Sequence, residues 1–183
     1  MSLSVSPRPD WNQLYEAAAT QQGLFTTRQA AEAGYSNPLI THHVRAGRFA
    51  RLRRGIYRLI HFPAGEHEDL VVVWLWSEHV GVFSHPTALA LQDSSDVLPK
   101  SVHLTVPVAW QQRRLRVPKG MVLHFGKVAR ADRAWVDAVP ITNPGRTLRD
   151  CAEDHFSPEL LEQALAQARY RGLVPASFRP DGI

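Results

Sequence analysis

The sequence predicts an α+β protein in which an N-terminal winged helix-turn-helix is followed by a mixed α/β C-terminal domain with a small sheet. Two short helices with capping residues and terminal glycines follow one another between Thr26 and Gly47. An arginine-rich hairpin pattern comes directly after them, up to Leu59, and beyond it helical and strand patterns alternate. With 183 residues and 44% hydrophobic content, the chain can bury a sizeable core.

The first two helices are predicted from their caps. Asp10 can cap a helix that begins at Trp11, and Gly23 follows its end. Thr26 and Gln29 have the spacing of a capping box, so each can satisfy a free backbone donor of the other. The second helix therefore begins at Thr26 and ends at Gly34.

The third helix is expected to begin at Ser36 or Asn37 and to end at Gly47. Pro38 falls in its first turn, where a missing N–H removes no helical hydrogen bond. The link to the second helix is about three residues long, which is the length that a helix-turn-helix requires.

One face of the third helix is predicted to contact DNA. Ile40 and Val44 are one helical turn apart and should face the core, with His43 in the packing seam. The opposite face then carries side chains that can hydrogen-bond to base edges in the major groove. These candidates for base contacts are Asn37, Thr41, His42 and Arg45.

A basic hairpin follows the third helix. Phe49 and Leu52 begin one strand, and Ile56, Tyr57 and Leu59 belong to its partner, with Gly55 in the turn. No acidic residue occurs between residues 36 and 60, which favours contacts with phosphates over a solvated basic face. The candidate phosphate contacts are Arg48, Arg51, Arg53, Arg54 and Arg58.

Net charge supports the same assignment. The chain has a formal charge of +4, but the residues up to Leu59 carry eight arginines against three acidic residues, so the basic excess lies in this N-terminal third. The sequence therefore predicts a polyanionic partner, double-stranded DNA, for the N-terminal third alone.

Cysteine content and hydropathy predict a cytoplasmic protein. Cys151 is the single cysteine, which excludes an internal disulfide and a cysteine-based zinc cluster. The N-terminus lacks the apolar run of a signal peptide, and no stretch approaches the roughly 18 apolar residues of a membrane span. No membrane association is expected.

Pro, Gly and polar residues at 61–68 suggest a boundary between a first domain, 1–60, and a second, 61–183. In the second domain the patterns predict helices over 66–78 and 84–91, strands over 102–106, 121–128 and 139–141, and helices that begin at Asn143 and Ser157. A basic group, Arg113, Arg114, Arg116 and Lys119, falls between two of these strands. It fits either a nucleic-acid or acidic-partner contact or a solvated hairpin tip.

Three segments resemble the AbiEi family of antitoxins, the regulatory partners of nucleotidyltransferase-like toxins in type IV toxin-antitoxin systems. The first combines LFTTRQAAEAG with RFARLRRGIYRL, which contain the winged helix-turn-helix. The second is VFSHPTALALQDSSDVLPKSVHLTVP, from Val82 to Pro107, and the third is VPITNPGRTLRD, from Val139 to Asp150. They occur in family order and extend over most of the chain.

The resemblance implies an N-terminal domain that represses its own operon and a C-terminal domain that is needed for antitoxicity. By position in the family motifs, the candidates in the C-terminal domain are Ser84, His85, Thr87 and Arg146. A structural interpretation competes with this one: Ser84 would cap a helix, and Arg146 would pair with Asp150 one turn later.

No catalytic residue, metal site or cofactor is expected. Seven histidines are scattered along the chain outside the third helix, at positions 61, 67, 79, 85, 103, 124 and 155, without an HExxH motif or a cysteine pair. There is no glycine-rich phosphate loop either. An enzyme is therefore disfavoured.

The predicted function is a transcriptional autorepressor and antitoxin that binds its own promoter, at inverted repeats if two copies bind. The alternative is a stand-alone winged-helix regulator whose second domain senses a ligand or dimerises. A toxin gene beside this one would favour the first function, and an apolar pocket with a few polar groups would favour the second.

Overall fold

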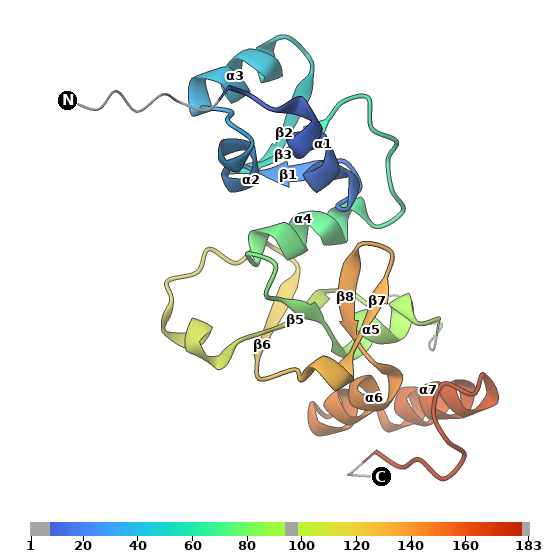
Figure 1. Cartoon of the computed structure of the whole chain (residues 1–183). Helices are drawn as coiled ribbons and strands as arrows, with labels where there is room; N and C mark the ends of the chain where they lie inside the picture. Colours follow the sequence, from blue (N-terminus) through green and yellow to red (C-terminus); the bar gives the residue numbers. More distant parts are fainter. Residues whose placement is uncertain (1–7, 94–98, 181–183) are drawn as a thin grey trace. The chain divides into compact units, whose positions relative to one another are not determined.

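A computed structural model of the chain describes residues 8–93 and 99–180. The chain divides between His79 and Val80 into two compact units, which we call the N-terminal and the C-terminal unit (Figure 1). The division lies beyond the expected boundary after residue 60, because helix α4 (Glu68–Trp76) packs against strands β1 and β3 of the N-terminal unit. No helix in the described part is long and apolar enough to cross a membrane.

The N-terminal unit has the elements of a winged helix-turn-helix. In chain order they are α1 (Trp11–Ala19), β1 (Leu24–Thr26), α2 (Thr27–Glu32), α3 (Asn37–Arg45), β2 (Phe49–Arg53), β3 (Ile56–Leu59) and α4. The strands form an antiparallel sheet in the order β1-β3-β2. Strand β1 was not predicted; it extends the expected hairpin to a three-stranded sheet.

The predicted caps of the first three helices are confirmed. Asp10 Oδ1 accepts a hydrogen bond from Gln13 N at 3.1 Å. Thr26 and Gln29 form both bonds of the capping box, at 3.2 and 2.9 Å. Ser36 is the cap of α3, and Pro38 lies in its first turn. The helix-turn-helix is thus specified by short-range contacts along the sequence.

Phe25 joins the helices to the sheet. Its side chain is fully buried, and its ring lies 4.9 Å from that of Phe49 and 5.7 Å from that of Tyr57 between centroids. Leu14 of α1 and Ile40 of α3 belong to the same core. The hairpin and the third helix therefore share one hydrophobic core, which fixes the position of one relative to the other.

A pair of glycine substitutions tests the packing of this unit. Gly23 and Gly47 both have positive φ, +81° and +69°, but a Cβ at Gly23 would lie 2.5 Å from Phe62 Cγ, whereas one at Gly47 meets no atom within 4 Å. Gly47→Ala should lower the free energy of unfolding by about 1–2 kcal/mol from backbone strain alone. Gly23→Ala should lower it by a further 1–3 kcal/mol, roughly, because Phe62 must move.

Urea denaturation of the two variants, followed by circular dichroism, measures this difference. Equal losses of stability in Gly23→Ala and Gly47→Ala would contradict the close packing of Phe62 on Gly23.

The C-terminal unit is a five-stranded mixed sheet covered by helices. Its elements are β4 (Val82–Phe83), α5 (His85–Leu91), β5 (Val102–Val106), η1 (Val108–Gln112), β6 (Met121–Phe125), η2 (Arg130–Asp132), β7 (Arg133–Val136), β8 (Val139–Thr142), α6 (Pro144–Glu153) and α7 (Pro158–Tyr170). The strand order is β6-β5-β4-β8-β7. Helices α6 and α7 lie side by side, and α6 also packs on α5 (Figure 1). Leu148 and Cys151 of α6 are buried in this helical layer.

Strands β5 and β6 pair in parallel, so the basic group between them is not at a hairpin tip. The connection crosses over through η1, where Trp110 is buried and the Arg113 guanidinium carbon lies 4.4 Å from the centre of its ring. Arg114, Arg116 and Lys119 are exposed in this connection. The hairpin-tip interpretation was therefore wrong.

Candidate functional site

Helix α3 presents a polar face on the N-terminal unit. All four predicted base-contact residues, Asn37, Thr41, His42 and Arg45, are exposed. Ile40 is buried and Val44 packs against the core, as predicted. His43 also packs as predicted: its ring lies 4.8 Å from that of Phe49, and burial, together with Arg48, lowers its pKa. The side chains on the exposed face of α3 therefore take no part in the hydrophobic core.

Four of the five predicted phosphate-contact arginines are exposed beside α3: Arg48, Arg51, Arg53 and Arg54. Arg58 differs. Its side chain is 23% exposed, its Nε lies 3.3 Å from Glu68 Oε2, and its Nη2 donates a hydrogen bond to Phe62 O at 3.1 Å. Because these contacts hold the Arg58 guanidinium against α4, we leave Arg58 out of the candidate DNA surface. We call the four exposed arginines and the polar face of α3 the basic surface.

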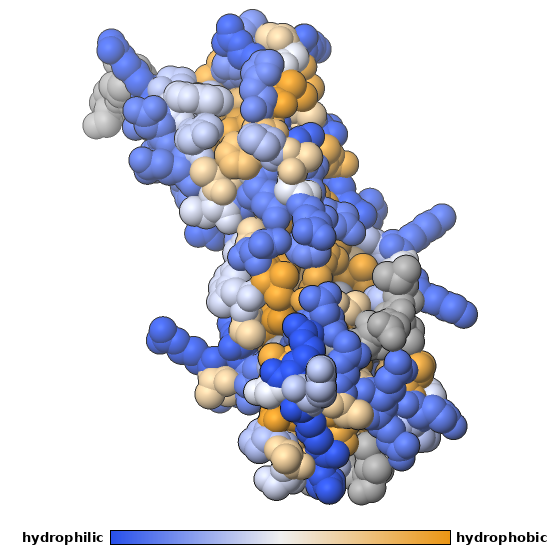
Figure 2. All heavy atoms as spheres, turned by 90° about the vertical axis from the view of Figure 1, so that its right-hand side faces the viewer, coloured by the Kyte–Doolittle hydropathy of each residue, from blue (hydrophilic) through white to orange (hydrophobic). Residues whose placement is uncertain are grey.

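An apolar groove lies elsewhere on the N-terminal unit. Its volume is about 520 Å³, and its lining includes Trp11, Tyr15, Ile60 and Phe62. Trp11 and Tyr15 are about half exposed, at 49% and 45%. Figure 2 shows such apolar side chains at the surface of this unit among hydrophilic ones.

A polar pocket of about 400 Å³ lies in the C-terminal unit. Its walls come from α5, β5, β6, η1 and α6. The lining residues that carry polar side chains are His85, Thr105, Gln111, His124, Arg146, Asp150, Glu153 and Asp154. Two of the four candidates that the family motifs indicated, His85 and Arg146, therefore line one pocket.

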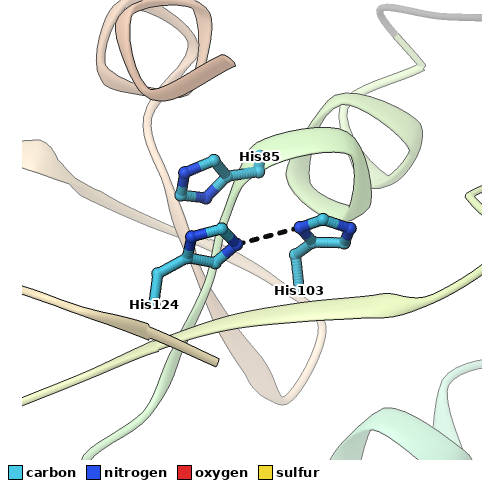
Figure 3. A group of neighbouring side chains, drawn as sticks. All are labelled: His85, His103 and His124. Carbon is cyan, nitrogen blue, oxygen red and sulfur yellow. Dashed lines mark hydrogen bonds between the residues drawn. The ribbon is translucent and has the colours of Figure 1, made fainter. Parts of the chain in front are cut away.

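Three histidines meet beside this pocket (Figure 3). The rings of His85 and His124 stack with centroids 3.5 Å apart, and His103 Nδ1 lies 2.9 Å from His124 Nε2. One nitrogen from each ring lies within 4.8 Å of the other two. We call His85, His103 and His124 the histidine cluster. It was not predicted, because these residues are 18 and 21 positions apart in the sequence.

The parallel register of β5 and β6 creates the cluster. Thr105 is the partner of His124, and side chains two residues apart on a strand share a face. His103 and His124 therefore project from the same face of the sheet. His85 is the first residue of α5 and has a φ of +55°, which is uncommon for a residue with a side chain.

Burial lowers the pKa of all three histidines. For His85 the pKa falls to about 3, first through burial and then through the neighbouring His124 and His103. The pKa of His103 is lowered by burial and by His124. For His124 burial outweighs Asp154 and Asp150, which favour the charged form. All three imidazoles are therefore neutral at pH 7, the form that can accept a hydrogen bond or ligate a metal.

Ser84 and Thr87 lie behind the cluster and are buried. Ser84 occupies the N-cap position of α5, as predicted, but its side chain makes no capping hydrogen bond. Instead, Ser84 Oγ lies 2.8 Å from Thr105 Oγ1 and 2.8 Å from His85 Nδ1. Thr87 Oγ1 accepts a hydrogen bond from His103 N at 2.8 Å. Both hydroxyls thus hold α5 on β5.

Arg146 forms the predicted pair with Asp150. Its Nε donates to Asp150 Oδ1 at 2.6 Å, and its Nη1 lies 3.4 Å from Asp132 Oδ2. The second oxygen of Asp150, Oδ2, is buried and has no hydrogen-bond partner among the described residues. Burial raises the pKa of Asp150, and the hydrogen bond from Arg146 opposes that rise.

Comparison with known proteins supports the interpretation of the N-terminal unit. Residues 12–60 match a family model described as a transcriptional regulator, AbiEi antitoxin. Among solved structures, the crystal structure of the RV2827C protein from Mycobacterium tuberculosis is similar, with a TM-score of 0.48 and 17% identity over 87% of this chain and 74% of that chain. A search of the curated proteins finds no match.

The matched region runs from the second residue of α1 to the end of the hairpin, and so includes the whole basic surface. An exposed polar helix beside exposed arginines is an arrangement with which a helix-turn-helix can contact DNA. Residues 12–60 of this chain are thus similar to the AbiEi antitoxin family of transcriptional regulators.

Proposed function

We propose that this protein represses its own promoter and is the antitoxin of a type IV toxin-antitoxin system, counteracting a nucleotidyltransferase-like toxin. The observation that carries the proposal is the basic surface within the AbiEi-matched residues: a polar helix face beside four exposed arginines, with no acidic residue between positions 36 and 60.

On DNA, α3 enters the major groove and its exposed side chains contact base edges. Arg51, Arg53 and Arg54 of the hairpin contact flanking phosphates, which adds affinity without sequence preference. Occupation of the promoter excludes RNA polymerase. If two copies bind, the two half-sites are inverted repeats about one helical turn apart.

Substitution of Asn37 or Arg45 tests the base contacts. Asn and Arg can form bidentate hydrogen bonds to adenine and guanine, so alanine at either position should cost about 1–3 kcal/mol on the true site. Affinity for unrelated DNA should change much less with Asn37→Ala, because its side chain is uncharged. Fluorescence anisotropy with the promoter fragment and with a scrambled fragment measures both affinities.

Thr20→Ala is a control for these variants, because Thr20 is an exposed residue at the end of α1 whose hydroxyl bonds to Ala17 O within its own helix. If Asn37→Ala and Arg45→Ala bind the promoter as tightly as Thr20→Ala does, α3 does not lie in the groove as proposed.

Growth rescue tests the antitoxin role. The neighbouring open reading frame is expressed from an inducible promoter, and the full chain is supplied in trans. A second form carries Asn37→Ala, Arg45→Ala, Arg53→Ala and Arg54→Ala, which removes DNA binding but leaves the C-terminal unit unchanged. Rescue by both forms is expected, because antitoxicity is assigned to the C-terminal unit. The antitoxin role would be contradicted if the product of the neighbouring open reading frame is toxic and neither form, although well expressed, restores growth.

One alternative is a regulator whose C-terminal unit senses a small ligand, although the pocket in this unit is polar and not the apolar one expected for that function. The pocket brings His85, Arg146 and three carboxylates around about 400 Å³, which suits a polar ligand better than an apolar one. A ligand-sensing regulator should bind the promoter but should not rescue growth when the neighbouring open reading frame is expressed.

A further inference from the structure

We propose that His85, His103 and His124 form a binding site for a divalent transition-metal ion of the zinc type. The site goes beyond the proposed function and does not depend on it. It rests on three ring nitrogens, one from each histidine, that lie within 4.8 Å of one another. Imidazole nitrogen is a preferred ligand of Zn²⁺, and three histidines with one open position form a known type of zinc site.

The spacing of the cluster is close to that of a metal site. Two nitrogens bound to a tetrahedral Zn²⁺ at about 2.0–2.1 Å are separated by roughly 3.3 Å. His103 Nδ1 and His124 Nε2 are 2.9 Å apart, so a small rotation of either ring accommodates the ion. Figure 3 shows the two rings with these nitrogens directed at each other and His85 lying over His124. The His85 ring must tilt out of the stack to direct a nitrogen at the same point.

The backbone positions are fixed by the fold. His103 and His124 lie on paired strands of one sheet, and α5 is held on that sheet through Ser84 and Thr87. The bond between Ser84 Oγ and His85 Nδ1, at 2.8 Å, is the kind of outer contact that orients a ligating imidazole. Only side-chain rotations are therefore needed to form the site.

The surroundings favour a cation. Asp150 and Asp154 of the α6 region line the same pocket as His85 and His124, so two carboxylates lie near the cluster. Asp150 Oδ2 is buried without a hydrogen-bond partner among the described residues. Arg146 is the opposing positive charge, but Asp150 and Asp132 already hold its guanidinium. The second oxygen of Asp150 is therefore available to accept a hydrogen bond from a water on the ion.

Three protein ligands leave a fourth coordination position. His85 and His124 also line the polar pocket, so this position faces a space that can hold water or a small anionic ligand. The ion would also join α5, β5 and β6, and so stabilise the C-terminal unit by an amount that rises with the logarithm of the free ion concentration above the dissociation constant.

The test uses the full chain, stripped of metal by a chelator and titrated with Zn²⁺ by calorimetry. We expect about one ion per chain, a dissociation constant of about 1 µM or lower, and a melting temperature raised by several degrees at saturation. Co²⁺ at the same site should show the intense visible bands of tetrahedral coordination. His103→Gln and His124→Gln should each weaken Zn²⁺ binding at least 100-fold.

His155→Ala is the matched control, because His155 is an exposed histidine of the same unit outside the cluster. It should bind Zn²⁺ as the unchanged chain does. Binding weaker than about 100 µM in the unchanged chain, or an equal loss in His155→Ala, would overturn the proposal. If His124→Gln does not fold, the Co²⁺ spectrum of the unchanged chain decides: weak octahedral bands reject the site and strong tetrahedral bands support it.

Discussion

Replacing Arg53 and Arg54 together with alanine is expected to weaken binding to double-stranded DNA about equally on the promoter and on unrelated sequences. Both side chains are exposed at the end of the hairpin, where glycine permits the turn. If each contacts one phosphate, the slope of log affinity against log salt falls by about 0.9 per contact, or roughly 1.8 in total. At about 0.15 M salt this corresponds to a loss of roughly 30-fold in affinity.

Arg114→Ala with Arg116→Ala is the matched control, because it removes the same charge from another exposed segment. Anisotropy titrations at several salt concentrations should show an unchanged slope for this control. An unchanged slope for the Arg53 and Arg54 variant would remove the hairpin from the interface. A slope reduced in both variants would add the β5–β6 connection to the DNA surface.

The helix-turn-helix was predictable because its signals are local. The bonds of Asp10, of Thr26 with Gln29, and of Ser36 each join residues three positions apart, so a reader of the sequence can identify them directly. Strand β1 was not predictable in this way. It is three residues long and exists because it pairs with β3, whose partner residues lie 30 to 34 positions later.

The partial burial of Arg58 was also not predictable from the sequence. Its sequence context is indistinguishable from that of the exposed arginines, since it lies in the same acid-free segment. The difference is Glu68, ten positions later on α4, which packs against β3 and provides a partly buried partner at 3.3 Å. Whether an arginine in this hairpin contacts α4 or solvent depends on packing that no local pattern encodes.

The histidine cluster of the C-terminal unit was not predictable from the sequence either, because it depends on long-range packing. The sequence predicts strands over 102–106 and 121–128, but not their relative direction. A parallel pair has no short turn whose residues specify the register. Only that register brings His103 and His124 to one face, and only the packing of α5 adds His85. Histidines that are scattered in the sequence can therefore converge without any motif.

Substitution of Arg146 by methionine is expected to lower the free energy of unfolding of the C-terminal unit by about 3 kcal/mol. The Asp150 side chain is 6% exposed and receives the Arg146 Nε hydrogen bond at 2.6 Å. Without this partner the carboxylate is buried with an unbalanced charge, because its other oxygen has no hydrogen bond among the described residues. The carboxyl can protonate instead, which limits the loss.

Arg149→Met is the control, since it makes the same change three residues later on α6. Arg149 is 41% exposed, and its Nη2 lies 3.9 Å from Asp132 Oδ1, so its loss should cost less than about 1 kcal/mol. Urea denaturation followed by tryptophan fluorescence measures both values. Similar losses in Arg146→Met and Arg149→Met would show that the pair with Asp150 contributes no special stability.

The double variant Arg146→Met with Asp150→Asn separates structure from antitoxin activity. Removing both charges eliminates the unbalanced carboxylate, so the double variant should be more stable than Arg146→Met alone. If growth rescue returns with stability, Arg146 acts by holding Asp150 and the pocket wall. The arginine of the family motif would then have a structural role. If the double variant is stable but does not rescue growth, the Arg146 guanidinium itself is required for antitoxicity.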